Sequence, residues 1–254
     1  MCKRIIRAIP NTLTCCNLLS GCIAVTFASG GDFGLAALFI FIGGVFDFLD
    51  GMTARLLHVS SPIGRELDSL SDVVTFGLAP AMMIHSFLTS GLSNEVEGIT
   101  SIITFIPFLM TVFSALRLAR FNLDERQATS FIGLPTSANG LFWAALLYDP
   151  STLTSDLSVL TPSFILYFIL ALVLLFSWLL VSPIPIFSMK FHNLTWRDNY
   201  IRYIFLAVSI VLIILLGIRG GAAVIGWYIV LSLLTNNVNE STSQRVNESK
   251  GQKQ

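Results

Sequence analysis

Long apolar runs recur along the whole chain, each separated from the next by a short polar stretch. A helix needs about 20 apolar residues to cross the roughly 30 Å hydrocarbon core of a bilayer. Eight runs approach or reach that length, and they fall near 12–29, 33–56, 66–89, 98–121, 137–149, 163–182, 201–217 and 221–235. The fifth run is short, and only a Gly-Ile-Arg-Gly turn separates the last two. The pattern predicts an all-α integral membrane protein with about eight transmembrane helices.

Composition indicates the same class of protein. The 254 residues are 54% hydrophobic and only 12% charged, with a mean hydropathy of +0.77. Soluble domains carry about 25% charged residues, so this chain is too apolar to be one. We therefore expect membrane lipid around the protein and no nucleic acid as a partner.

The basic residues indicate how the helices are oriented, because cytoplasmic loops retain Lys and Arg. If the N-terminus is cytoplasmic and eight helices cross the membrane, 14 of the 15 basic residues fall on the cytoplasmic side. Arg219 is the exception. Loss or fusion of one helix would break this alternation, so the charges favour an even number of crossings with the N- and C-termini both cytoplasmic.

The two ends of the chain differ from the apolar runs. Residues 1–10 place Lys3, Arg4 and Arg7 among apolar side chains. This suits either an interfacial amphipathic segment on an anionic inner leaflet or a positive flank that orients the first crossing. Residues 236–254 are rich in Asn, Ser, Gln and Lys, which predicts a disordered cytoplasmic tail.

Four aspartates lie in the second and third apolar runs. An Asp in the middle of a membrane helix costs about 3 kcal/mol, so such residues usually face the bundle interior. Asp47 and Asp50 are three residues apart, and Asp68 and Asp72 are four apart, so each pair shares one helix face. A short cytoplasmic loop joins the two helices and makes them antiparallel neighbours. The four carboxylates are therefore predicted to converge near the cytoplasmic side.

Clustered carboxylates repel one another strongly at low dielectric, so the group must take up protons or bind cations. Hard oxygen ligands in this number suit Mg²⁺ or Mn²⁺, with carboxylates that two ions can share. Gly51, Ala54 and Gly64 lie among the aspartates, and such small residues either allow close helix packing or leave a groove for a bulky ligand. Their position between four aspartates favours the groove, and Arg55 at its mouth suits a pyrophosphate.

The fixed positions form the pattern D-x2-D-G-x2-A-R-x8-G-x3-D-x3-D over residues 47–72. This pattern resembles the signature of the CDP-alcohol phosphotransferases, integral membrane enzymes that displace CMP from a CDP-linked donor with an alcohol. The resemblance implies a six-helix core followed here by two further helices, a requirement for Mg²⁺ or Mn²⁺, and a homodimer. It also implies metal binding by Asp47, Asp50, Asp68 and Asp72, with Asp72 as the catalytic general base. The residues implied to bind the CDP donor are Asn11, Thr14, Asp47, Gly51, Ala54, Arg55 and Gly64.

Sequence outside the signature resembles the phosphatidylserine synthase subgroup of that family. The opening stretch at 10–21 carries Asn17 where the glycerophosphate-accepting relatives usually have Arg, which argues against a phosphorylated acceptor. Arg117, Arg120 and Asn122 at the end of the fourth run suit the carboxylate of serine. A positive-inside anchor explains either arginine alone nearly as well.

Two later segments, 133–137 and 182–190, are also similar to that subgroup. The prolines of the second segment predict the end of the sixth helix. The organisation that follows is an interfacial segment at 1–10, a catalytic core at 11–190, a transmembrane hairpin at 191–235 and a tail at 236–254.

From the resemblance we expect a multi-pass enzyme of the cell (cytoplasmic) membrane with its active site facing the cytoplasm. The expected reaction, a step of phospholipid biosynthesis, transfers the phosphatidyl group of CDP-diacylglycerol to the hydroxyl of L-serine and releases CMP. One alternative is the same chemistry with glycerol phosphate, inositol phosphate or an amino alcohol as acceptor. Another is a cation-coupled transporter, although the sequence has no evident inverted repeat to support it.

Overall fold

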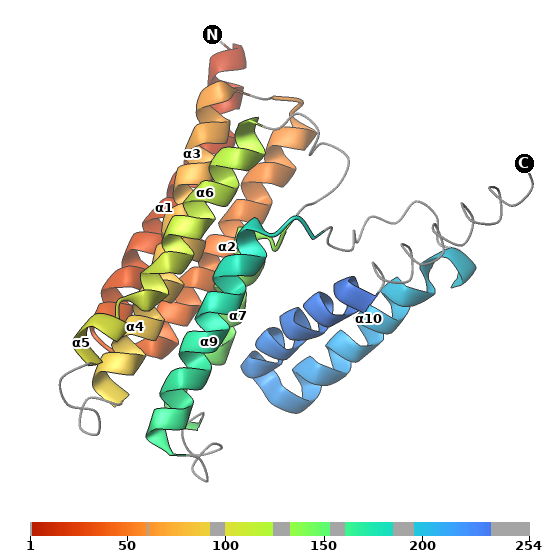
Figure 1. The fold of residues 1–254 in the computed structure, drawn as a ribbon. Coiled ribbons are helices and arrows are strands. Elements are labelled where there is room, and N and C mark those ends of the chain that lie inside the picture. Colours follow the sequence, from red (N-terminus) through yellow and green to blue (C-terminus); the bar gives the residue numbers. More distant parts are fainter. Residues whose placement is uncertain are drawn as a thin grey trace, which may run out of the picture.

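The computed structural model describes residues 2–59, 61–91, 100–123, 133–152, 161–184 and 196–234. All regular elements in these ranges are helical, as the sequence predicts. Most of the helices pack side by side into one bundle, and a pair of helices near the C-terminus lies beside it (Figure 1).

The first two helices form an antiparallel pair. α1 runs over Cys2–Ser29 and α2 over Phe33–Leu56. Gly31 adopts a positive φ of 79° in the turn between them, a conformation that glycine adopts without steric cost. Asp32 then caps α2 by accepting a hydrogen bond of 3.1 Å from the backbone N–H of Leu35. This turn starts α2 at one end of the bundle and carries its aspartates to the other end.

The third crossing consists of three consecutive helical segments. α3 spans Pro62–Asp72, the π-helical segment η1 spans Val73–Leu78, and α4 spans Ala79–Gly91. Ser61 caps α3 by accepting a hydrogen bond of 3.0 Å from the backbone N–H of Gly64. A proline fills the first turn, where its missing N–H costs nothing. The helix therefore begins before the apolar run that predicted it.

The remaining helices of the bundle include α7, a short helix that is largely buried. The elements are α5 (Thr100–Ile103), the 3-10 turn η2 (Ile106–Phe108), α6 (Leu109–Leu123), α7 (Thr136–Leu146) and α9 (Pro162–Val181). Trp143 and Asn139 of α7 are both fully buried. α9 ends just before Pro183, as the proline predicted.

Six continuous helical stretches in the described ranges are long and apolar enough to cross a membrane, where the sequence predicted about eight crossings. They cover Ala8–Ser29, Phe33–Leu56, Pro62–Ser90, Ile106–Leu123, Ser163–Val181 and Tyr200–Leu234. The predicted fifth crossing corresponds to α7, whose 11 residues are too few for an independent span.

The predicted seventh and eighth crossings fall within the single stretch Tyr200–Leu234. In this stretch α10 (Trp196–Leu216) is followed by the 3-10 turn η4 (Gly217–Arg219) and a helix at 220–234. Gly217 has a φ of 59°, and the two helices fold back on each other as a hairpin (Figure 1).

The turn of this hairpin contacts the bundle. Arg219 donates a hydrogen bond of 2.9 Å from its guanidinium to the backbone carbonyl of Asp149. A Cβ added to Gly221 would lie 3.2 Å from that of Ala145 in α7, and Ala222 is buried. The hairpin therefore packs on the short helix α7.

Several sequence predictions lie outside the described residues. These are the part of the 182–190 segment from residue 185 onward, the tail at 236–254, and the side chains of Lys3, Arg4 and Arg7. The backbone of α1 is helical from Cys2 and continues through Pro10.

Candidate functional site

Three of the four signature aspartates meet between α2 and α3, which both pack against α1. Asp47 and Asp50 come from α2, and Asp68 comes from α3. Each offers one carboxylate oxygen, and these oxygens all lie within 4.8 Å of one another. Thr14 of α1 donates a hydrogen bond of 2.6 Å to Oδ2 of Asp50, which is only 6% exposed. The structure thus brings together three side chains that the spacing predicted to converge.

The donor set of this cluster fits a hard divalent cation. Carboxylate oxygens are the ligands that Mg²⁺ and Mn²⁺ prefer. Among the described residues, the buried Oδ1 of Asp68 has no hydrogen-bond partner. A buried polar atom without a partner is costly, so this oxygen is suited to a ligand. Asp47, Asp50 and Asp68 could therefore hold a metal ion.

Asp72 lies one helical turn beyond Asp68 and has a partner of its own. Its Oδ1 accepts a long hydrogen bond of 3.4 Å from Nδ2 of Asn17 in α1. Asp72 interacts electrostatically with the other three aspartates but is not one of the three whose oxygens lie within 4.8 Å. It is therefore a carboxylate beside the metal ligands, oriented by a buried amide.

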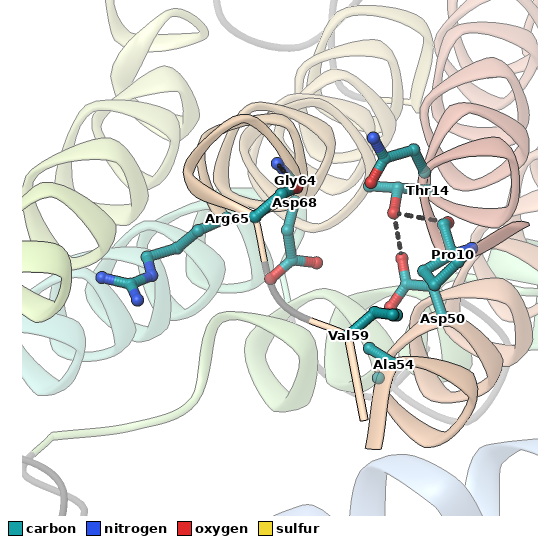
Figure 2. A pocket seen from close by; sticks show the side chains of 11 residues that line it. Pro10, Thr14, Asp50, Ala54, Val59, Gly64, Arg65 and Asp68 are labelled. Carbon is teal, nitrogen blue, oxygen red and sulfur yellow. Dashed lines mark hydrogen bonds between the residues drawn. The ribbon is translucent and has the colours of Figure 1, made fainter. Parts of the chain in front are cut away.

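A cleft of about 250 Å³ opens beside the carboxylates. Figure 2 shows Asp50 and Asp68 facing it from different helices. Five of the seven residues that the resemblance assigned to the donor line this cleft, whereas Asp47 and Arg55 do not. The lining residues are Pro10, Asn11, Thr14, Asp50, Gly51, Ala54, Val59, Ser61, Gly64, Arg65 and Asp68.

The two glycines of the cleft have different roles. A Cβ added to Gly64 would lie 2.9 Å from Oγ of Ser61 and 3.0 Å from Oδ1 of Asn11, so this glycine allows α3 to approach α1 closely. A Cβ added to Gly51 would have only the guanidinium of Arg55 nearby, at 3.9 Å. Gly51 therefore leaves open space of the kind a ligand groove requires, while Gly64 leaves room for the side chains of Ser61 and Asn11.

Two arginines lie at the rim of the cleft. Arg55 is exposed, and its Nε donates a hydrogen bond of 2.9 Å to the backbone carbonyl of Gly51. Arg65 is also exposed and extends away from Asp50 in Figure 2. Sequence reasoning did not select Arg65 or Ser61 for the cleft. A serine before a proline is a helix N-cap signal that could have located Ser61, whereas Arg65 carried no such signal.

Arg117 of α6 is directed into the bundle. Its Nη1 donates a hydrogen bond of 3.0 Å to Oγ1 of Thr136, the first residue of α7. Its Nε is buried without a hydrogen-bond partner among the described residues. The guanidinium also interacts electrostatically with Asp72. Arg117 is thus the cation on the Asp72 side of the cluster, and sequence reasoning did not identify its partner Thr136.

The other residues predicted for the acceptor have different surroundings. Arg120 is exposed near the end of α6. Asn122 donates a hydrogen bond of 3.0 Å from Nδ2 to Oγ of Ser69 in α3. Asn17 is fully buried and contacts Asp72, as described above. The structure therefore separates the two arginines that the sequence paired.

The sequence model of the CDP-alcohol phosphatidyltransferase family matches residues 7–214. This range includes both aspartate-bearing helices and every residue that lines the cleft. The chain belongs to that family.

Several relatives share one name, CDP-diacylglycerol–serine O-phosphatidyltransferase. The relative from Bacillus subtilis is 37% identical over 160 residues, which are 61% of this chain and 86% of the relative. The relative from Methanocaldococcus jannaschii is 38% identical over 138 residues, 54% of this chain and 59% of the relative. The relative from Mycobacterium leprae is 28% identical over 246 residues, 90% of this chain and 73% of the relative.

Proposed function

We propose that this protein transfers the phosphatidyl group of CDP-diacylglycerol to the hydroxyl of L-serine, giving phosphatidylserine and CMP. The observation that carries the proposal is the meeting of three signature carboxylates beside one cleft, in a chain similar to proteins named for this reaction. The reaction is a step of phospholipid biosynthesis, and it suits a membrane enzyme because donor and product are both lipids.

Asp47, Asp50 and Asp68 would hold the divalent metal, with Asp72 at its side and a second ion sharing these carboxylates. Bound there, Mg²⁺ or Mn²⁺ would neutralise charge on the donor pyrophosphate and on the departing CMP. Thr14 supports this role because its hydroxyl fixes one oxygen of Asp50 and so limits the directions in which that carboxylate can turn.

Asp72 would be the general base. The serine hydroxyl attacks the phosphorus that carries the diacylglycerol, the bond from that phosphorus to the CMP oxygen breaks, and Asp72 takes the hydroxyl proton. Asn17 donates to Oδ1 of Asp72, which leaves Oδ2 for the proton. The catalytic role of Asp72 thus rests on its position beside the metal ligands and not among them.

The cleft would hold the CDP part of the donor. Gly51 and Ala54 keep its floor free of large side chains, and Asn11 offers a polar side chain at its edge. Arg55 lies at the rim, from which its exposed guanidinium can turn toward the donor phosphates. The acyl chains of the donor would remain in the surrounding bilayer.

Serine would bind on the Asp72 side of the metal. Arg117 has an Nε without a partner among the described residues, which suits the carboxylate of an amino acid. Asn17 lies on the same side of the cluster. Arg120 and Asn122 lie further toward the end of α6 and would meet serine as it enters.

The cleft would face the cytoplasm of the cell membrane, where serine and CMP are dissolved. Both termini would then be cytoplasmic, as the distribution of Lys and Arg predicts. The homodimer that the resemblance implies stays a prediction.

An acceptor panel tests this function directly. Purified protein in detergent receives CDP-diacylglycerol, Mn²⁺ and one alcohol at a time: serine, glycerol phosphate, inositol phosphate or ethanolamine. We expect CMP release with serine only, and phosphatidylserine as the lipid product by mass spectrometry. Equal CMP release with glycerol phosphate would refute serine as the acceptor.

The same assay tests the general base. Asp72→Asn keeps the size of the side chain but removes its capacity to take a proton, so turnover should be lost while the thermal unfolding temperature stays near that of the unchanged protein. Full activity of this variant would assign the proton transfer to another group.

A further inference from the structure

The helix that carries Asp72 changes its geometry immediately after this residue. η1 begins at Val73, and at its end the backbone N–H of Ala79 donates to the carbonyl of Val74, five residues back. Such π-helical turns are rare and often lie at functional sites. A π-helical turn contains one more residue than an α-helical turn. It therefore rotates the side chains on one side of the turn relative to those on the other. The orientation of Asp72 against α4 therefore depends on η1.

A proline and an asparagine together explain this turn. In a regular α-helix the carbonyl of Phe76 would accept from the N–H of residue 80, but residue 80 is proline and has none. Instead, Nδ2 of Asn139 in α7 donates a hydrogen bond of 3.4 Å to the carbonyl of Phe76. Asn139 and Phe76 are both 0% exposed, so no solvent can replace this donor.

α7 also lies directly against the backbone of η1. A Cβ added to Gly140 would come within 2.7 Å of Cα of Phe76, so only glycine allows this approach. On the opposite side, Thr75 donates a hydrogen bond of 3.0 Å from Oγ1 to the carbonyl of Asn17 in α1. η1 is thus held between α7 and α1, and α1 also supplies the amide that contacts Asp72.

We propose that Asn139 is a positioning residue for the reaction: by bonding the Phe76 carbonyl opposite Pro80, it maintains the π-helical turn that sets the direction of Asp72. This inference rests on the proposed function, because it assumes that Asp72 takes the proton of the acceptor. Asn139 touches neither the metal ligands nor the cleft, so its effect is on the rate of the chemical step and not on donor binding.

Two substitutions test the proposal in the full-length protein. Asn139→Leu removes the donor at nearly equal size, and Pro80→Ala supplies a backbone N–H that can close a regular α-helical turn. Each should lower kcat about 10- to 100-fold, the cost of a small misplacement of a reacting group. The KM for CDP-diacylglycerol should stay unchanged, and CMP with Mn²⁺ should still raise the unfolding temperature.

Ser114→Ala is the matched control. Ser114 is a buried polar residue that also packs on η1, against Gly77. Its hydroxyl has no hydrogen-bond partner among the described residues, so its removal breaks no such bond. This control should keep the kcat of the unchanged protein. Wild-type kcat in Asn139→Leu, or a rise in donor KM in place of a fall in kcat, would overturn the proposal. If Asn139→Leu does not fold, the kcat of Pro80→Ala tests the proposal. An unchanged kcat in Pro80→Ala would show that the reaction does not need the π-helical turn.

Failure of the proposed function would give a different result from failure of the proposal for Asn139. It would appear in the unchanged protein as absence of CMP release with serine. The variants would then be compared with whichever acceptor the panel identifies, and the same fall in kcat at constant donor KM would be expected.

Discussion

The two arginines of α6 differ in what surrounds each side chain. Arg117 is half-buried, bonded to Thr136 and electrostatically coupled to Asp72. Arg120, three residues later, is exposed. A guanidinium that is already partly removed from water and lies beside the proposed base is better placed to bind the acceptor carboxylate than one in contact with solvent or lipid headgroups.

We therefore expect Arg117→Ala to raise the KM for serine more than Arg120→Ala does. Loss of a hydrogen bond to a charged group costs about 1.5–3 kcal/mol, which corresponds to a change of roughly 10- to 100-fold. The KM for CDP-diacylglycerol should change little in either variant. The measurement is the initial rate of CMP release as serine is varied at saturating donor.

Arg117→Lys serves as the control, because lysine keeps the charge but not the planar fork of donors. It should recover only part of the serine affinity. An unchanged serine KM in Arg117→Ala would mean that this arginine serves only to orient the helix in the membrane. A larger rise in serine KM in Arg120→Ala would place the serine-binding site at the exposed end of α6.

At the scale of elements, the turn before α7 determines where that short helix begins. The backbone N–H of Gly133 donates a hydrogen bond of 2.9 Å to the carbonyl of Ile184, and that of Leu134 donates one of 3.0 Å to the carbonyl of Leu179. Gly133 has a φ of 75°, and a Cβ added there would lie 2.8 Å from the carbonyl oxygen of Leu180. The backbone at and just after the end of α9 therefore fixes the position of the turn from which α7 begins.

Gly133→Ala should destabilise the protein, because alanine is strained at a positive φ and its Cβ overlaps the α9 backbone. We expect a loss of about 1–3 kcal/mol, measured as a lower unfolding temperature in detergent. Gly226→Ala is the matched control, since a Cβ there meets no atom within 4 Å and the position is helical. Equal unfolding temperatures for the two variants would contradict the strain at Gly133.

Elements and single contacts were not equally predictable from the sequence. Apolar runs predict membrane helices because burial in lipid depends on composition over about 20 residues, and Ser61 before a proline predicts a helix start. The convergence of Asp47, Asp50 and Asp68 followed from helical spacing and a short loop. These features are local, so neighbouring residues determine them.

Contacts between distant segments were not predicted. Asn17 and Asp72 are 55 residues apart in the chain, and Asn139 and Phe76 are 63 apart. Pro80 marks a disturbed helix, but whether the result is a kink, a break or a π-helical turn depends on the donor that α7 supplies. The different surroundings of Arg117 and Arg120 likewise arise from a contact between separate segments, the hydrogen bond from Arg117 to Thr136 at the start of α7.

For the whole molecule, the structure separates two ends. Pro10, Val59 and Ser61 lie around the cleft at one end. α2 then leads back to the other end, where Gly31 and Tyr148 border a second cavity. Arg219, which the charge distribution left alone on the outer side, bonds to the backbone of Asp149 at this second end. If the cleft faces the cytoplasm, as proposed, this hairpin turn lies on the outer side of the membrane.

Cysteine labelling in cells tests this orientation. His58 lies in the loop at the cleft end and Ser29 at the last turn of α1, and both are exposed. In a background whose native cysteines are replaced by serine, a membrane-impermeant maleimide should label Ser29→Cys in intact cells and His58→Cys only after lysis. The reason is that Lys and Arg beside the cleft are retained on the cytoplasmic side. Labelling of His58→Cys in intact cells, with CMP release preserved, would invert the topology and require serine to reach the cleft from outside.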